Sequence, residues 1–200
     1  MKNIFAIILL LVSINTILAQ GSWYELGGYK KSLNANGEIT SITSDQLGNV
    51  YAVGLFSDSL NFWDGNKYVA KWDGSSWSKL APNSLYSLGN FVFGNEIYYV
   101  KTDQFNNVYI GGHFKDTLNN YFIAKWDGNS WSKLSGNSLR YQIYGGDIEI
   151  DNFGTIYTSG HDNFNPSGTT VLYWNGSDWQ KLKSSTDSID VNGDIYRIIA

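Results

Sequence analysis

Three aspartates recur at one position of an internally repeated sequence, and they are the first candidates for chemistry: Asp45, Asp103 and Asp151. Each follows an alternating run and precedes, by three residues, a Gly or Asn that opens a second run. Carboxylates suggest calcium, but Ca²⁺ takes roughly six to eight oxygen ligands, several of them carboxylates. Each loop offers a single carboxylate, so capping of its own turn explains the aspartates better.

A second acidic stretch, residues 187–194, is denser in oxygen ligands. It lacks the spacing of a calcium loop and the glutamate that closes one. The two histidines, His113 and His161, occupy equivalent repeat positions and could lie near each other at one rim. They supply too few ligands for a zinc or copper site. The sequence therefore predicts no metal and no cofactor.

Catalytic motifs are also missing from the sequence. There is no G-x-S-x-G, no phosphate loop and, because the chain has no cysteine, no Cys/His pair. We therefore expect a protein that is not an enzyme.

A repeated hairpin must position these residues. The stretch AKWDGSSW (Ala70 to Trp77) returns as AKWDGNSW (Ala124 to Trp131) and, loosened, as LYWNGSDW (Leu172 to Trp179). Asp-Gly and Asn-Gly between aromatic residues are typical of tight hairpin turns. The loop length is even, so the two tryptophans of each motif should share one face of the ribbon, where burial makes them packing residues.

The two landmarks together predict four strands in each repeat. In the first repeat they cover roughly residues 39–44, 49–56, 68–72 and 76–80. Repeated four-stranded antiparallel meanders are typical of the blades of a β-propeller. We expect an all-β propeller over residues 20–200, with blades at about 37–82, 95–136 and 146–183 and partial strands at 22–28 and 194–200. Three and a half blades indicate a piece of a larger propeller. The recurring Gly54, Gly112 and Gly160 should permit close backbone approach between blades.

The D-x-x-G-N-V-Y-x-x-G run at Asp45 to Gly54 resembles the repeat of secreted bacterial β-propellers. The K-W-D-G-x-x-W-x-x-L run at Lys71 to Leu80 is similar to repeats of kelch-like and galactose-oxidase-like propellers in exported bacterial proteins. This resemblance, which extends from about Trp23 onward, implies a fold and leaves function open. A copper-radical oxidase of the galactose oxidase type would need a cysteine that this chain lacks.

Composition excludes other classes. The chain is 42% hydrophobic and 16% aromatic with a net charge of −4, which fits neither disorder nor a basic nucleic-acid surface. Residues 1–19 carry a short positive start and an apolar run, Ile4 to Val12, which predict a signal peptide. The run is too short to span a membrane. We therefore expect a secreted or cell-surface protein with no transmembrane span after cleavage of the signal peptide.

Loop lengths suggest where binding occurs. Turns within strand pairs one-two and three-four are short and uniform, whereas the other connections differ between repeats and gather at the opposite end. That varied end would carry the predicted ligand-binding residues, on which a glycan or a protein partner could dock: Phe62, Trp63, Tyr86, Phe91, Arg140, Tyr141, Tyr144, His161 and Phe164. The sequence favours a non-catalytic binding scaffold. The alternatives are a secreted lectin and a non-catalytic module of a larger secreted hydrolase.

Overall fold

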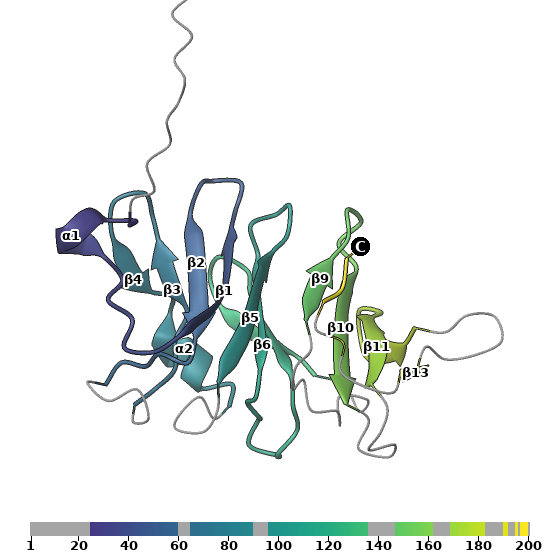
Figure 1. Ribbon diagram of the computed structural model, residues 1–200. Helices are drawn as coiled ribbons and strands as arrows, with labels where there is room; N and C mark the ends of the chain where they lie inside the picture. The colour runs from purple at the N-terminus through teal and green to yellow at the C-terminus, as the bar shows by residue number, and fades with distance from the viewer. Residues whose placement is uncertain are drawn as a thin grey trace, which may run out of the picture.

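The computed structural model describes residues 25–59, 65–89, 96–135, 147–161, 169–182, 190–191, 195 and 197–199, with the backbone alone at 29–30, 161 and 190–191. These described residues are all-β apart from two short helices (Figure 1). Three antiparallel sheets follow one another along the chain, and the four main strands of each lie in chain order. The expected all-β meanders are confirmed, and among the described residues the sheets do not form a closed ring.

The bounds of the elements repeat from sheet to sheet. The first sheet holds β1 (Ile39–Ser44), β2 (Val50–Gly54), β3 (Ala70–Trp72) and β4 (Trp77–Lys79). The second holds β5 (Ile97–Thr102), β6 (Val108–Gly112), β7 (Ile123–Trp126) and β8 (Trp131–Leu134). The third holds β9 (Ile148–Ile150), β10 (Ile156–His161), β11 (Thr169–Trp174) and β12 (Trp179–Lys181), and a short β13 (Asp190–Val191) also pairs with β11. The helices are α1 (Gly28–Lys31) and α2 (Pro82–Tyr86).

The tryptophan pairs lie as the hairpin pattern predicts. Trp72 and Trp77 are direct cross-strand partners, with ring centroids 5.8 Å apart, and the equivalent pairs in the other sheets are 5.6 and 5.4 Å apart. At the turn between them, the Asp73 Oδ1 accepts hydrogen bonds from the backbone amides of Ser75 and Ser76. Gly74 has a φ of +95°, a conformation that glycine adopts without strain.

A hydrogen bond from the outer tryptophan joins each sheet to the preceding repeat. The indole Nε1 of Trp131 donates to the carbonyl of Leu80 at 3.4 Å, and that of Trp179 donates to Leu134 at 3.0 Å. In the first sheet Trp77 donates to Leu26 at 3.2 Å. Leu26 therefore accepts from Trp77 as Leu80 and Leu134 accept from the later tryptophans. Leu26 and Gly27 form a turn before α1, and the partial strand at 22–28 stays a prediction.

The first strands of successive sheets lie side by side (Figure 1). The hydroxyl of Thr102 on β5 donates to the carbonyl of Ser44 on β1 at 2.8 Å. The backbone amide of Val100 donates to the Ser41 hydroxyl at 3.2 Å.

The same contact recurs after the third sheet, where the amide of Ile198 donates to Asp147 Oδ2 at 3.3 Å. Asp147 is the repeat equivalent of Ser41, and Ile198 is that of Val100. Ile198 therefore contacts the residue just before β9 as Val100 on β5 contacts Ser41 on β1.

Apolar side chains fill the space between sheets. One cluster packs the first sheet against the second and includes the fully buried Phe114 and Phe122, whose rings meet edge to face at 5.0 Å. A second cluster packs the second sheet against the third through Ile148, Leu172 and Trp179. Burial of such side chains is the main stabilising term of the array.

The recurring glycines serve a different contact from the one expected. A Cβ at Gly54 would lie 2.0 Å from the carbonyl oxygen of Glu38, and one at Gly112 would lie 2.1 Å from that of Glu96. Both carbonyls precede the first strand of the same sheet, where the register shifts. The tight approach is therefore within a sheet, and the expectation of contact between blades is wrong at Gly54 and Gly112. At Gly111, by contrast, an added Cβ would lie 2.9 Å from the Cδ1 of Ile148 in the neighbouring sheet.

We expect Gly112→Ala to lower the free energy of unfolding by about 1–3 kcal/mol, because a backbone carbonyl has little room to move. Gly111→Ala is the matched control, since it meets only the flexible ends of Ile148 and Ile123 and should cost less. Urea unfolding followed by tryptophan fluorescence measures both. Equal losses of stability in the two variants would contradict the close approach of the Glu96 carbonyl to Gly112.

Candidate functional site

The Asp45 carboxylate organises the β1–β2 turn. Its Oδ1 accepts from the backbone amides of Leu47 and Asn49 at 3.0 and 2.9 Å. Its Oδ2 accepts from the Asn49 side chain at 2.7 Å and from the Tyr51 hydroxyl at 2.9 Å. Both oxygens are thus occupied by the turn itself.

The other two sheets build the same turn. Asp103 repeats all four bonds, including one from the Tyr109 hydroxyl at 2.9 Å. Asp151 accepts from two backbone amides and from the Tyr157 hydroxyl at 3.2 Å. The aspartates therefore cap their turns, as the sequence predicts. In the part of the chain that the structure describes, no three His, Asp or Glu side chains are grouped to hold a metal ion.

These bonds perturb the carboxyls. Burial by itself raises the pKa of the Asp45 carboxyl, but hydrogen bonds from Asn49, Tyr51 and backbone amides outweigh it and hold the pKa below its ordinary value. The pKa of Asp151 is lowered by the same balance of desolvation against hydrogen bonds. Both side chains are therefore ionised at neutral pH.

A carboxyl whose pKa is lower in the folded chain than in the unfolded chain stabilises the fold above the unfolded pKa of about 3.9. That contribution is lost as the pH falls through the lowered folded pKa. We expect the free energy of unfolding to decrease once the pH is lowered past about 4. Urea unfolding at a series of pH values from about 7 to about 2 measures it. The double variant Asp45→Asn/Asp151→Asn should lose less over this range. An unchanged pH profile in that variant would contradict the assignment.

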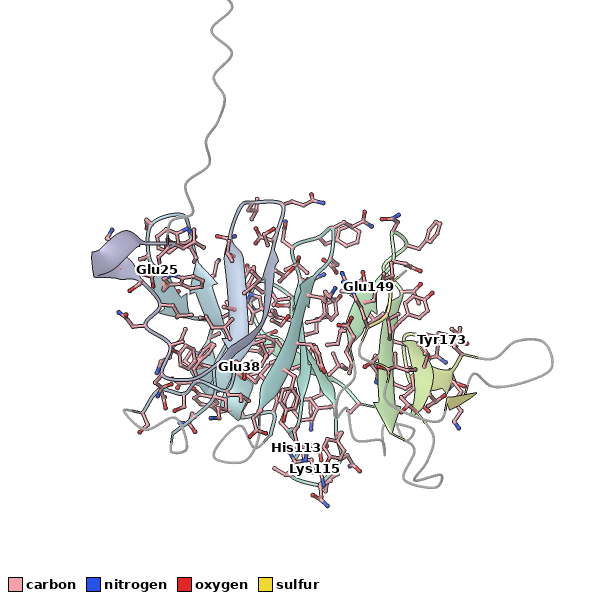
Figure 2. The ribbon with its side chains drawn as sticks, viewed as in Figure 1. Glu25, Glu38, His113, Lys115, Glu149 and Tyr173 are labelled. Atoms are coloured by element: carbon pink, nitrogen blue, oxygen red, sulfur yellow. The ribbon has the colours of Figure 1, made fainter. Side chains whose placement is uncertain are left out.

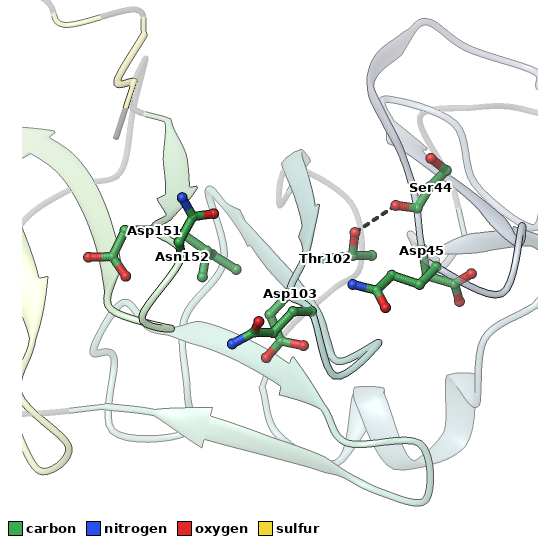
Figure 3. Close-up of a pocket in the computed structure, with 9 residues that line it drawn as sticks. Ser44, Asp45, Thr102, Asp103, Asp151 and Asn152 are labelled. Atoms are coloured by element: carbon green, nitrogen blue, oxygen red, sulfur yellow. Dashed lines mark hydrogen bonds between the residues drawn. The ribbon is translucent and has the colours of Figure 1, made fainter.

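The three capped turns converge on a recess of about 310 Å³ (Figure 3). Each sheet contributes three consecutive residues to it: Ser44–Gln46, Thr102–Gln104 and Ile150–Asn152. The turns also touch one another, because the backbone amide of Gln46 donates to Asn106 Oδ1 at 3.0 Å. The site is therefore formed by tertiary structure from segments about fifty residues apart, and sequence reasoning placed binding at the other end.

The residue after each aspartate presents an amide to the recess: Gln46, Gln104 and Asn152. All three side chains are exposed, and none has a hydrogen-bond partner among the described residues. An unpaired amide offers two donors and one acceptor oxygen. The recurrence of these amides was visible in the sequence, but only the structure shows that they meet.

Most of the ligand-binding residues predicted from the sequence lie outside the described residues: Phe62, Trp63, Phe91, Arg140, Tyr141, Tyr144 and Phe164. The side chain of His161 is also outside them. Tyr86, at the end of α2, has a buried hydroxyl without a hydrogen-bond partner among the described residues. Burial, with smaller contributions from Asp58 and Tyr68, raises the pKa of Tyr86 to about 12. The varied-end site stays a prediction.

His113 lies at the end away from the recess (Figure 2). Its Nε2 is 3.1 Å from the Tyr121 hydroxyl, and its Nδ1 is 3.9 Å from the Glu96 carboxylate. The predicted meeting with His161 falls outside the described side chains.

No helix among the described residues is long and apolar enough to cross a membrane.

In sequence comparisons, no protein-family model and no curated protein matches the chain. Among solved structures, a fucose lectin from Kordia zhangzhouensis, solved in complex with methyl-fucoside, is similar with a TM-score of 0.40. The sequences are 17% identical, and the match covers 70% of this chain and 95% of the lectin chain. The resemblance to kelch-like repeats stays a prediction.

Proposed function

We propose that the protein is an exported, non-catalytic carbohydrate-binding module whose sheets are blades of a β-propeller. Two repeated contacts support the propeller. First strands lie together, as with Thr102 and Ser44, and each outer tryptophan bonds the preceding repeat, as with Trp131 and Leu80. Both would arise if sheets turned about an axis near their first strands. The predicted signal peptide at residues 1–19 supports export.

The observation that carries the binding role is the recess at the three capped turns. Its amides, Gln46, Gln104 and Asn152, stand on backbone that the aspartate bonds hold in place. A rigid turn reduces the entropy lost when a side chain orders around a ligand. Binding residues commonly lie on loops that a rigid scaffold positions, and a few well-placed polar groups orient the ligand.

The chemistry of the recess suits a carbohydrate. A sugar hydroxyl both donates and accepts, and an amide side chain supplies both partners from one group. The hydroxyls of Ser44 and Thr102 lie beside the amides at the same recess. We infer no catalysis there, because the carboxylates of Asp45 and Asp103 already accept four hydrogen bonds each and are poorly placed to exchange protons with a substrate.

The test is binding of a panel of soluble glycans by isothermal titration calorimetry. Replacing all three recess amides with alanine should weaken binding at least tenfold, since each lost hydrogen bond contributes about 0.5–1.5 kcal/mol. Asn83→Ala, an exposed amide on α2, is the matched control and should bind normally. The alternative site, at the varied end predicted from loop lengths, is tested by Trp63→Ala and Tyr141→Ala. Loss of binding in these two variants, with the amide variant unaffected, would move the site to the varied end.

A further inference from the structure

The tips of the three capped turns carry large apolar side chains at equivalent positions: Leu47, Phe105 and Phe153. Their exposed fractions are 75%, 71% and 93%. Single exposed apolar residues are ordinary on protein surfaces. Here the exposure repeats at one position in three successive turns, and each tip directly follows an amide that lines the recess.

The fold does not need these side chains. The turn uses only their backbone, since the amides of Leu47, Phe105 and Phe153 donate to the preceding aspartates. None of the three belongs to a buried apolar cluster of the described chain. We call these three side chains the apolar rim. Each stands one residue beyond an amide that lines the recess, on hairpins that reach the same end of the molecule (Figure 1).

Charge restricts what the rim can hold. Among the described residues that line it, the recess has the carboxylates of Asp45, Asp103 and Asp151 and no lysine or arginine. The nearby Lys101 is paired with Glu149 at 2.7 Å and adds no net positive charge. An anionic ligand would meet a negative field here, which disfavours its binding.

The contact surface is also spread out. The polar groups are divided among three sheets, and sheets packed face to face lie about 10 Å apart. A single sugar could reach the amides of one or two turns, whereas a chain of sugars could meet all three. Flat phenyl rings at Phe105 and Phe153 are suited to the apolar faces of successive sugar rings.

Resting on the proposed function, we propose that the ligand is an uncharged polysaccharide chain that lies across the rim. Its sugar faces pack on Phe105 and Phe153 and against Leu47, while its hydroxyls bond the amides below. Affinity is then divided over several sugars, as in multivalent contacts, and a monosaccharide binds poorly.

The experiment is titration of the whole chain with neutral oligosaccharides of one to six or so units, from several β-linked and α-linked series. Affinity should rise at least tenfold from monomer to the longest oligomer in the preferred series. Matched oligomers bearing uronic acids should bind at least tenfold more weakly.

The variant Phe105→Ser/Phe153→Ser should lose most of the length dependence, at roughly three- to tenfold in affinity for each ring removed. Leu118→Ser is the matched control, because Leu118 is 78% exposed on the β6–β7 connection at the other end. The Leu118→Ser variant should bind the oligosaccharides with unchanged affinity. The unfolding midpoints of all these variants should also be unchanged.

The outcomes separate the two proposals. A monosaccharide that binds as tightly as its oligomers would overturn the polysaccharide assignment and leave the carbohydrate-binding function standing. Equal binding of uronic acid oligomers would overturn the requirement for a neutral chain. If no sugar of any length binds, the proposed function itself fails, and the polysaccharide assignment fails with it.

Discussion

Trp179→Ala is expected to lower the free energy of unfolding by about 3–5 kcal/mol, a large part of what a small domain has. The side chain is 1% exposed and packs in the cluster between the second and third sheets. Its ring faces Trp174 at 5.4 Å, and its indole donates to the Leu134 carbonyl at 3.0 Å. Alanine would leave both a cavity and an unpaired Leu134 carbonyl at the contact between the second and third sheets.

Two further variants separate these contributions. Trp179→Phe keeps much of the packing and loses the donor, so we expect a smaller loss, about 1–3 kcal/mol. Phe153→Ala removes an exposed ring and should change stability by no more than about 0.5 kcal/mol. Urea unfolding followed by circular dichroism gives all three values. If Trp179→Ala lowered the free energy of unfolding as little as Phe153→Ala, the contact of Trp179 with the second sheet would not hold the third sheet in place.

Asp103→Ala is expected to destabilise the protein by about 2–4 kcal/mol. The variant removes the acceptor of four hydrogen bonds, and bonds to a charged group are stronger than neutral ones. One donor is the hydroxyl of Tyr109, whose side chain is buried, and it would be left without its partner. Desolvation and the bond to Asp103 raise the pKa of Tyr109, so the hydroxyl stays a donor over the accessible pH range.

The size of the effect is checked against a simpler turn. Asp127 caps the exposed β7–β8 turn through two backbone amides and a longer bond from the Ser130 hydroxyl at 3.4 Å, so Asp127→Ala should cost less than Asp103→Ala. Asp103→Asn keeps one oxygen for the backbone amides and should fall between the two. Thermal and urea unfolding measure the series. Equal costs for Asp103→Ala and Asp127→Ala would contradict the role of the Tyr109 bond.

Local chemistry explains how much of the fold was predictable. The strand predicted at residues 39–44 matches β1 (Ile39–Ser44), because alternation and the following Asp45 define both the strand and its end. The other strands of that sheet are a few residues shorter than predicted, since pairing stops where the partner strand ends. The Trp72–Trp77 pairing followed from an even loop length.

The glycines show the limit of such reasoning. Sequence recurrence marked Gly112 as a place of close approach, but it could not say which backbone approaches. The carbonyl of Glu96 lies against Gly112 because the β5–β6 register shifts there, which is a property of the paired strands. The position that approaches a neighbouring sheet is Gly111, where an added Cβ would meet Ile148.

The sequence by itself determined the repeat, the meander order and the turn aspartates, because periodicity and turn chemistry are local and recur three times. Only the tertiary structure decided that Gln46, Gln104 and Asn152 share one recess and that the apolar side chains next to them are exposed. The physical reason is that the contacts between first strands and the tryptophan bonds between repeats join residues about fifty positions apart. No local pattern specifies how those contacts bring the turns together.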